Sequence, residues 1–446
     1  MRTTILLLCA FALSTSALAQ ADANPNPDKP KRPDIATLVE FIRFEMASSV
    51  ELLSKHSGKA DATDLRKALQ DRIDVGEAEL LGAAWSLSSE GHRGKVEGIE
   101  ELIYPTEFDP ANSASTLTLK NVDTDVFETL PATPIAYETR NIGITLEVDP
   151  SIDPSGMIHL NLSPERVILG EEIQFHHPDV APSAKIPIFH STRLTTSIAT
   201  KSGAYALAGV GRDPSDYLQR VFMFVRADQR GEAKELEPDS VPEISTMVEF
   251  IGADVADAVR LVSNHSGDEN AIELRAAVQQ LLEAGEAELL DASLVRSQSG
   301  QRASVEGIVE WVYPTEFDPP IVFGGLTLEN VDTEAFKPIA SSPSALETRN
   351  LGAMLEIEAT LGEEGEPLVL SLASELVGLD RFTAEWPETP EDWTLTSPER
   401  MPIFHSMRTF SRIQIRNGER QLAALIPNPG KPGQHVFVFV RTDILE

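Results

Sequence analysis

The sequence predicts an α+β fold made of two tandem homologous modules, each with two helices followed by a mostly antiparallel β domain. Three observations lead to this prediction: a long internal repeat, apolar residues at helical spacing where each repeat begins, and alternating apolar residues through the rest of it. Helical and alternating spacings are the main local signals of helices and strands. Their order, helices first and strands after, favours an α+β module.

The internal repeat covers most of the chain. Its first matches lie 209 residues apart, and the later ones lie 215 residues apart. The strings, in the first and then the second copy, are YPTEFDP at 104–110 and 313–319, ETRN at 138–141 and 347–350, and PIFHS at 187–191 and 402–406. Ordered matches over such a length indicate the tandem duplication of one module.

The N-terminus has the pattern of a cleaved export signal. Arg2 precedes a short apolar stretch at residues 5–13, and Ala17 and Ala19 supply the small residues of a cleavage site. The stretch is too short for a permanent membrane span. The expected boundaries are a signal peptide at 1–19, a flexible leader at 20–34, a first module at 35–226, a linker at 227–245 and a second module at 246–446.

Composition excludes several classes of function. The chain has 37 Lys and Arg against 70 Asp and Glu, a formal charge of -33. This charge argues against binding nucleic acid or anionic lipid. The single cysteine, Cys9, lies in the predicted signal, so the mature chain is expected to have no disulfide. No segment after the signal resembles a transmembrane helix.

Each module is predicted to open with two helices. The apolar positions of the first helix are Leu38, Phe41, Ile42, Met46 and Val50 in one module, and Met247, Ile251, Val255, Val259 and Val262 in the other. The second helix is marked by Leu65, Leu69 and Ile73, and by Leu274, Val278 and Leu281. Gly76 and Gly285 are its expected ends.

About six to eight strands are predicted to follow in each module. Residues 142–148 and 351–357 alternate apolar with polar or small residues. Asn417-Gly418 predicts a hairpin turn, with Gly203 at the matching position of the first module. Residues 221–225 and 436–440 are apolar on both faces, which predicts central, buried strands.

Four strand motifs resemble the C-terminal domain of bacterial secretins. They are GITLEVDP at 143–150, TTSIATKSGAYALAG at 195–209, GQRASV at 300–305 and VFVFVRT at 436–442. The resemblance implies the fold of that domain, which serves type II and type III secretion and type IV pilus machines. It also implies a location in the cell envelope, either periplasmic or associated with the outer membrane.

The chain departs from the secretin pattern where the outer-membrane lip would be built. That place holds short polar turns at 210–220 and 426–435. The hairpins before them, at 191–209 and 406–426, carry charge on both faces, which is costly in hydrocarbon. We therefore expect an envelope protein that does not itself form a pore.

Residues retained in both modules are the candidate site residues. They are Tyr104, Pro105, Glu107, Phe108, Asp109, Arg140 and His190, and their counterparts Tyr313, Pro314, Glu316, Phe317, Asp318, Arg349 and His405. We interpret them as structural. Each histidine is expected to be hydrogen-bonded at a strand start, and Arg140 to hold a carboxylate, with Glu138 or Glu107 as the candidates.

No catalytic residue, cofactor or metal ion is expected. Acids at i and i+2 of PTEFD point the same way, whereas glycoside hydrolysis needs carboxylates that face each other. His176-His177 could form a zinc pair, but the second module has no counterpart. No phosphate-binding loop or nucleophile motif is present.

The sequence thus predicts an exported, non-enzymatic structural or assembly component of the envelope. Its expected partners are envelope proteins, from secretion or pilus machinery or from its own assembly. Two alternatives stay open: a free periplasmic binding or adhesion protein with the same fold, and a hydrolase that uses the YPTEFD acids.

We predict that the mature chain begins at Gln20, because the cleavage site ends at Ala19. Intact-mass measurement of protein recovered from the envelope fraction checks this. A mass that includes residues 1–19 would contradict it.

Overall fold

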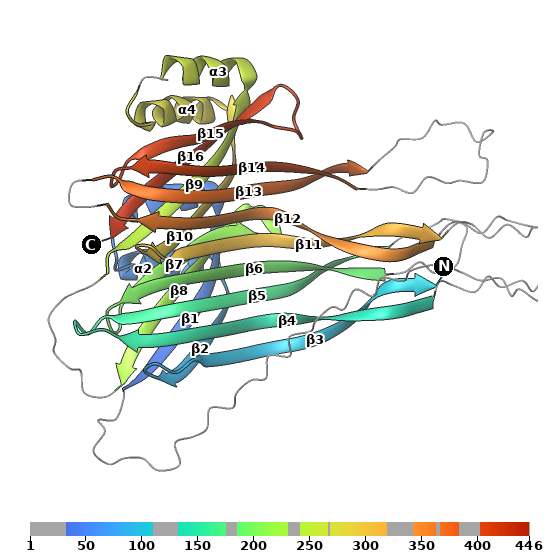
Figure 1. Ribbon diagram of the computed structural model, residues 1–446, viewed down its shortest axis with the longest axis horizontal. Coiled ribbons are helices and arrows are strands. Elements are labelled where there is room, and N and C mark those ends of the chain that lie inside the picture. Colours follow the sequence, from blue (N-terminus) through green and yellow to red (C-terminus); the bar gives the residue numbers. More distant parts are fainter. Residues whose placement is uncertain are drawn as a thin grey trace, which may run out of the picture.

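The computed structural model describes residues 33–109, 133–174, 185–230, 241–265, 268–318, 342–362, 366–382 and 402–445. Within these ranges the chain forms sixteen strands and four helices of 10 to 13 residues (Figure 1). The protein is therefore mostly β, and the predicted α+β class is wrong. The predicted signal peptide and the pair His176-His177 lie outside the described residues.

The two modules contain the same elements in the same order. The first consists of β1 (Asp34–Glu45), α1 (Met46–His56), α2 (Thr63–Asp74), β2 (Ala78–Ser89), β3 (Gly94–Asp109), β4 (Thr133–Ile152), β5 (Ile158–Gln174), β6 (Lys185–Thr200), β7 (Tyr205–Asp213) and β8 (Asp216–Arg230). The second consists of β9 (Glu243–Asp254), α3 (Val255–Asn264), α4 (Ile272–Ala284), β10 (Ala287–Gln298), β11 (Arg302–Asp318), β12 (Ser342–Thr360), β13 (Leu368–Phe382), β14 (Pro402–Ile415), β15 (Arg420–Pro427) and β16 (Gln434–Leu445).

The strands form two eight-stranded antiparallel sheets, and each sheet takes half of its strands from each module. Sheet A has the order β15-β16-β9-β10-β7-β8-β1-β2. Sheet B runs β14-β13-β12-β11-β6-β5-β4-β3, as the long horizontal strands of Figure 1 show. Near its end β3 also pairs with β12 at Glu107 and Ala345. The modules are thus joined edge to edge in both sheets.

The main hydrophobic core lies between the two sheets and is shared by the modules. It includes Leu146 and Leu194 of the first module with Val305 and Leu355 of the second, all nearly inaccessible to solvent. Each helix pair packs beside sheet A with a cluster of its own. In the first of these clusters Leu65 and Leu69 of α2 contact the sheet.

The first predicted helix of each module is wrong over its first half. Leu38, Phe41 and Ile42 lie in β1, and the helix begins only at Met46. Both faces of β1 are buried: Phe41 belongs to the core between the sheets, and Ile42 belongs to the cluster beneath the helices. Burial on both faces puts apolar residues at neighbouring positions, which imitates helical spacing. The same occurs in β9, which occupies the first half of the helix predicted in the second module.

Other predicted elements are confirmed. Residues 221–225 of β8 and 436–440 of β16 are fully buried, and both strands are internal to sheet A. Gly418 and Gly203 occupy hairpin turns with φ of 76° and 84°. Gly285 ends α4 in the left-handed conformation. Strands β8 and β9 occupy both ends of the predicted linker, and its residues 231–240 lie outside the described ranges.

No helix within the described ranges has the length and apolar character needed to cross a membrane.

A glycine pair fixes the β3–β4 ladder. Gly143 has φ of +133°, and a Cβ built there would overlap the carbonyl oxygen of Gly98 across the ladder. Gly98 itself has ordinary backbone angles, and a Cβ there would meet nothing within 4 Å.

We therefore predict that Gly143→Ala lowers the free energy of unfolding by about 3 kcal/mol, because strain and overlap act together. Gly98→Ala is the matched control and should change it by less than about 1 kcal/mol. Urea unfolding followed by circular dichroism measures both. Equal effects would show that the backbone angle of Gly143 is not the cause.

Candidate assembly interface

The junction between the modules is a pair of hairpins lying side by side. Strand β11 pairs with β6 from Ser304–Thr195 to Glu310–Phe189, and β10 pairs with β7 at Leu294–Val210 and Val295–Gly209. Hairpin β10–β11 is the counterpart of β2–β3, and hairpin β6–β7 is the counterpart of β14–β15. Apart from the pairing of β3 with β12 at Glu107, the molecule therefore ends with hairpin β2–β3 on one side and β14–β15 on the other.

A buried ion pair crosses the junction in sheet A. Arg220 Nη2 donates to Asp291 Oδ1 at 2.9 Å, and both side chains are almost inaccessible. Arg220 Nε also donates to the Ala292 carbonyl at 2.8 Å. Burial lowers the pKa of Arg220, and the negative charge of Asp291 opposes that change. An arginine buried this deeply depends on its partner.

A second polar group crosses the junction in sheet B. Arg140 binds Glu310 through two hydrogen bonds, Nη2 to Oε1 at 2.5 Å and Nε to Oε2 at 3.0 Å. Ser191 Oγ donates to the same Glu310 oxygen at 2.7 Å. Glu165 links Arg140 to Arg193, at 3.1 and 2.8 Å. We call Arg140, Glu165, Ser191 and Arg193 the Arg140 cluster; Glu310 enters it from the other module.

The second module contains the same cluster without the entering glutamate. Arg349 Nη2 lies 3.1 Å from Glu375 Oε1 and 3.1 Å from Ser406 Oγ, and Arg408 Nη2 lies 2.7 Å from Glu375 Oε1. These four residues are the counterparts of the Arg140 cluster, and we call them the Arg349 cluster. The counterpart of Glu310 is Glu101, which is exposed on β3 at the opposite end of the sheet.

The predicted partner of Arg140 was wrong, although its role in holding a carboxylate is observed. Glu138 instead accepts a hydrogen bond from the Tyr104 hydroxyl at 3.2 Å. Burial and the nearby Glu138 raise the pKa of Tyr104 to about 12. The Tyr104 ring packs against Phe189, with centroids 5.3 Å apart, and Tyr313 packs on Phe404 at the same distance.

The remaining YPTEFD residues shape the ends of β3 and β11. The register shifts after Pro105 in β3 and after Pro314 in β11. Phe108 is buried, whereas the side chains of Glu107 and Glu316 are exposed. Asp109, Phe317 and Asp318 end their strands. Near their ends β3 and β11 both pair with β12 at Ala345, so Glu107 and Glu316 flank one residue of β12 with their side chains exposed.

His190 differs from the expected hydrogen-bonded histidine at a strand start. It lies within β6, and its buried Nδ1 has no hydrogen-bond partner among the described residues. Burial lowers its pKa. A Cβ on Gly170 would lie 2.7 Å from its Nε2, so the imidazole fills space left by that glycine. His405 lies near the start of β14, opposite Gly378.

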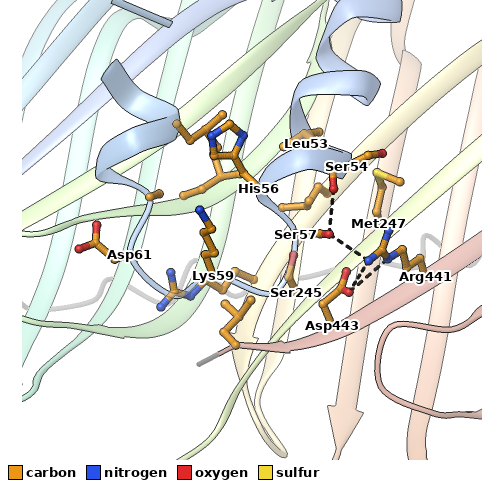
Figure 2. Close-up of a pocket in the computed structure, with 17 residues that line it drawn as sticks. Leu53, Ser54, His56, Ser57, Lys59, Asp61, Ser245, Met247, Arg441 and Asp443 are labelled. Carbon is orange, nitrogen blue, oxygen red and sulfur yellow. Dashed lines mark hydrogen bonds and ion pairs between the residues drawn. The ribbon is translucent and has the colours of Figure 1, made fainter. Parts of the chain in front are cut away.

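A small cavity lies where the α1–α2 connection meets the second module (Figure 2). Its volume is about 40 Å³. Arg441 Nη2 donates to Ser57 Oγ at 2.9 Å and pairs with Asp443 at 2.7 Å. The space suits a few water molecules rather than a substrate. Elsewhere as well as at this cavity, the described residues contain no group of three His, Cys, Asp or Glu side chains that could hold a metal ion.

No protein-family model and no curated protein matches the chain. Among solved structures, the chain is distantly similar to the InvG secretin domain β-barrel from the Salmonella SPI-1 injectisome NC-base. The sequence identity is 13%, the TM-score is 0.23, and the match covers 58% of this chain and 75% of that chain. A similarity of this size does not assign the chain to a family.

We predict that Asp291→Ala lowers the free energy of unfolding by about 3–5 kcal/mol, because it leaves the Arg220 charge buried without a partner. Asp149→Ala removes a carboxylate from the exposed pair with Arg93 and is the control, at less than about 1 kcal/mol. Chemical unfolding of the mature chain measures both. An effect of Asp291→Ala as small as that of the control would show that the buried charge of Arg220 does not depend on Asp291.

Proposed function

We propose that this protein is an exported, non-enzymatic structural component of the cell envelope that binds protein partners by strand addition at its open sheet edges. The observation that carries the proposal is the strand order. Among the described residues, β2 and β15 end sheet A with one side unpaired, and β14 ends sheet B in the same way. The only pairing that the described residues make on the outer side of β3 is with β12 at Glu107. Open edges of this length present unpaired backbone groups to another strand.

Apolar side chains on these outer strands support the proposal. Trp85 on β2 is 48% exposed, whereas its counterpart Leu294, which faces the filled junction, is 7% exposed. Phe410 on β14 is 78% exposed. Large exposed apolar side chains beside an unpaired strand are typical of a contact surface.

The sequence supports the envelope setting. The signal-like N-terminus, the absence of cysteine after residue 19 and the strong negative charge are consistent with an exported protein. The resemblance of the strand motifs to secretins favours a partner within a type II secretion or type IV pilus machine. The short polar turns in place of the lip favour a role other than pore formation.

The structure offers less support for an enzyme. Glu107 and Glu316 are exposed on two strands that flank β12, and neither residue lines the small cavity at the junction. A hydrolase needs two carboxyl groups on opposite sides of a bound substrate. A free periplasmic binding or adhesion protein is the remaining alternative, and the following experiment distinguishes it.

We predict that a photoreactive amino acid at Trp85 or Phe410 forms adducts with envelope proteins in living cells. The same probe at Asn161 is the control, because that exposed residue of β5 is paired with Asp149 of β4 on one side and with Ser197 of β6 on the other. Gel electrophoresis and mass spectrometry of the adducts are the measurement. A chain that gives no protein adduct at either edge would be a free periplasmic protein, and the proposal would be wrong.

A further inference from the structure

Building on the proposed function, we infer that the protein bound at the open edges is a second copy of this chain. The two copies dock head to tail, with hairpin β2–β3 of one against hairpin β14–β15 of the next. In this arrangement Glu101 of one copy enters the Arg349 cluster of its neighbour.

The junction within the chain is the template for this contact. Within the chain, hairpin β6–β7 of the first module binds hairpin β10–β11 of the second. Their counterparts, β14–β15 of the second module and β2–β3 of the first, remain at the two ends of the molecule. In the internal ladder Glu306 lies opposite Arg193, and Ile308 lies opposite Ser191. The same register between copies places Glu97 opposite Arg408, and Ile99 opposite Ser406. The β3–β12 contact at Glu107 lies beyond this segment and leaves it open.

Charge is complementary between the two ends. Strand β3 carries four glutamates and Asp109 with one basic residue, Lys95; the glutamates are Glu97, Glu100, Glu101 and Glu107. Strand β14 carries Arg408 and Arg412 and no acidic residue, in a chain whose net charge is -33. Opposite charges on facing strands favour pairing and fix its register. Without Glu101, the Arg349 cluster has two arginines for one glutamate.

A glycine on β3 leaves space for the neighbouring copy. At the internal junction a Cβ on Gly307 would overlap the carbonyl oxygen of Arg212 in β7. The counterpart of Gly307 is Gly98, where a Cβ would meet nothing within 4 Å. The counterpart of Arg212 is Pro427, at the end of β15. Docking of a second copy would bring the Pro427 backbone to the space beside Gly98.

The contact between copies lacks part of the internal junction. His435 and Gly82 stand at the positions of Arg220 and Asp291, so the buried ion pair is absent, and Ile426 stands at the position of Gly211. The contact between copies is therefore weaker than the internal one and depends on concentration. Because it joins two different faces, repetition gives a closed ring or an open filament.

Sedimentation equilibrium of the mature chain over a range of concentrations tests the inference. We expect reversible self-association, weakened at least about tenfold by Glu101→Arg or by Arg349→Glu. Mixing these two variants should restore association, because each keeps the end that the other lacks. Asp71→Arg, on an exposed position of α2, makes the same charge change as Glu101→Arg and should have no effect.

Gly98→Val provides a steric test that does not involve charge. It should leave the circular dichroism spectrum unchanged and make the chain monomeric, whereas Gly307→Val should disrupt folding. A wild-type chain that stays monomeric at all concentrations would overturn the inference, and so would association unaffected by Gly98→Val and both charge variants. In-cell adducts at Trp85 that contain only a different protein would also overturn it, while the proposed function would stand.

Discussion

The pairing of β6 with β11 is the contact on which the rest of the structure depends. A β-module that ends in unpaired strands exposes backbone groups that must find partners, either protein or water. Duplication in tandem satisfies one such edge by placing the second module against the first. It satisfies that edge in both sheets at once, because β10 lies beside β7 where β11 lies beside β6. The shared core between the sheets follows from this continuity.

Two features specify how the strands meet at the junction: the close approach of two backbones and the burial of a charged pair. Gly307 lets β11 come against the end of β7, and a larger residue would separate the strands. Arg220 and Asp291 form a pair whose desolvation is costly, so its value lies more in defining one register than in adding stability. In sheet B the hydrogen-bonded group of Arg140, Glu310 and Ser191 likewise joins the two modules, but its charges are only partly removed from water.

The internal repeat, the buried strands such as β16 and the hairpin turns could be predicted from the sequence, because each depends on residues that are neighbours in the chain. Gly418 and residues 436–440 behave as their local patterns indicate. Strand β1 does not, because helices cover one of its faces and sheet B the other, and this double burial imitates helical spacing. The partner of Arg140 could not be predicted either. Glu310 lies 170 positions away along the chain, and only the order of the strands brings it close.

Comparison of the two modules shows which interface residues occur only at the internal junction and which occur both there and at the ends of the molecule. The modules within one chain are held together covalently, so their effective concentration is high and a tight, buried pair can select one register. Arg220, Asp291 and Gly211 occur only there. Glu101, Gly98, Arg349 and Ser406 have the same identity as their counterparts at the filled junction. Faces that only contacted water would need neither the glycine nor the glutamate, whereas a face that meets another copy reversibly needs both and has no use for a buried charge.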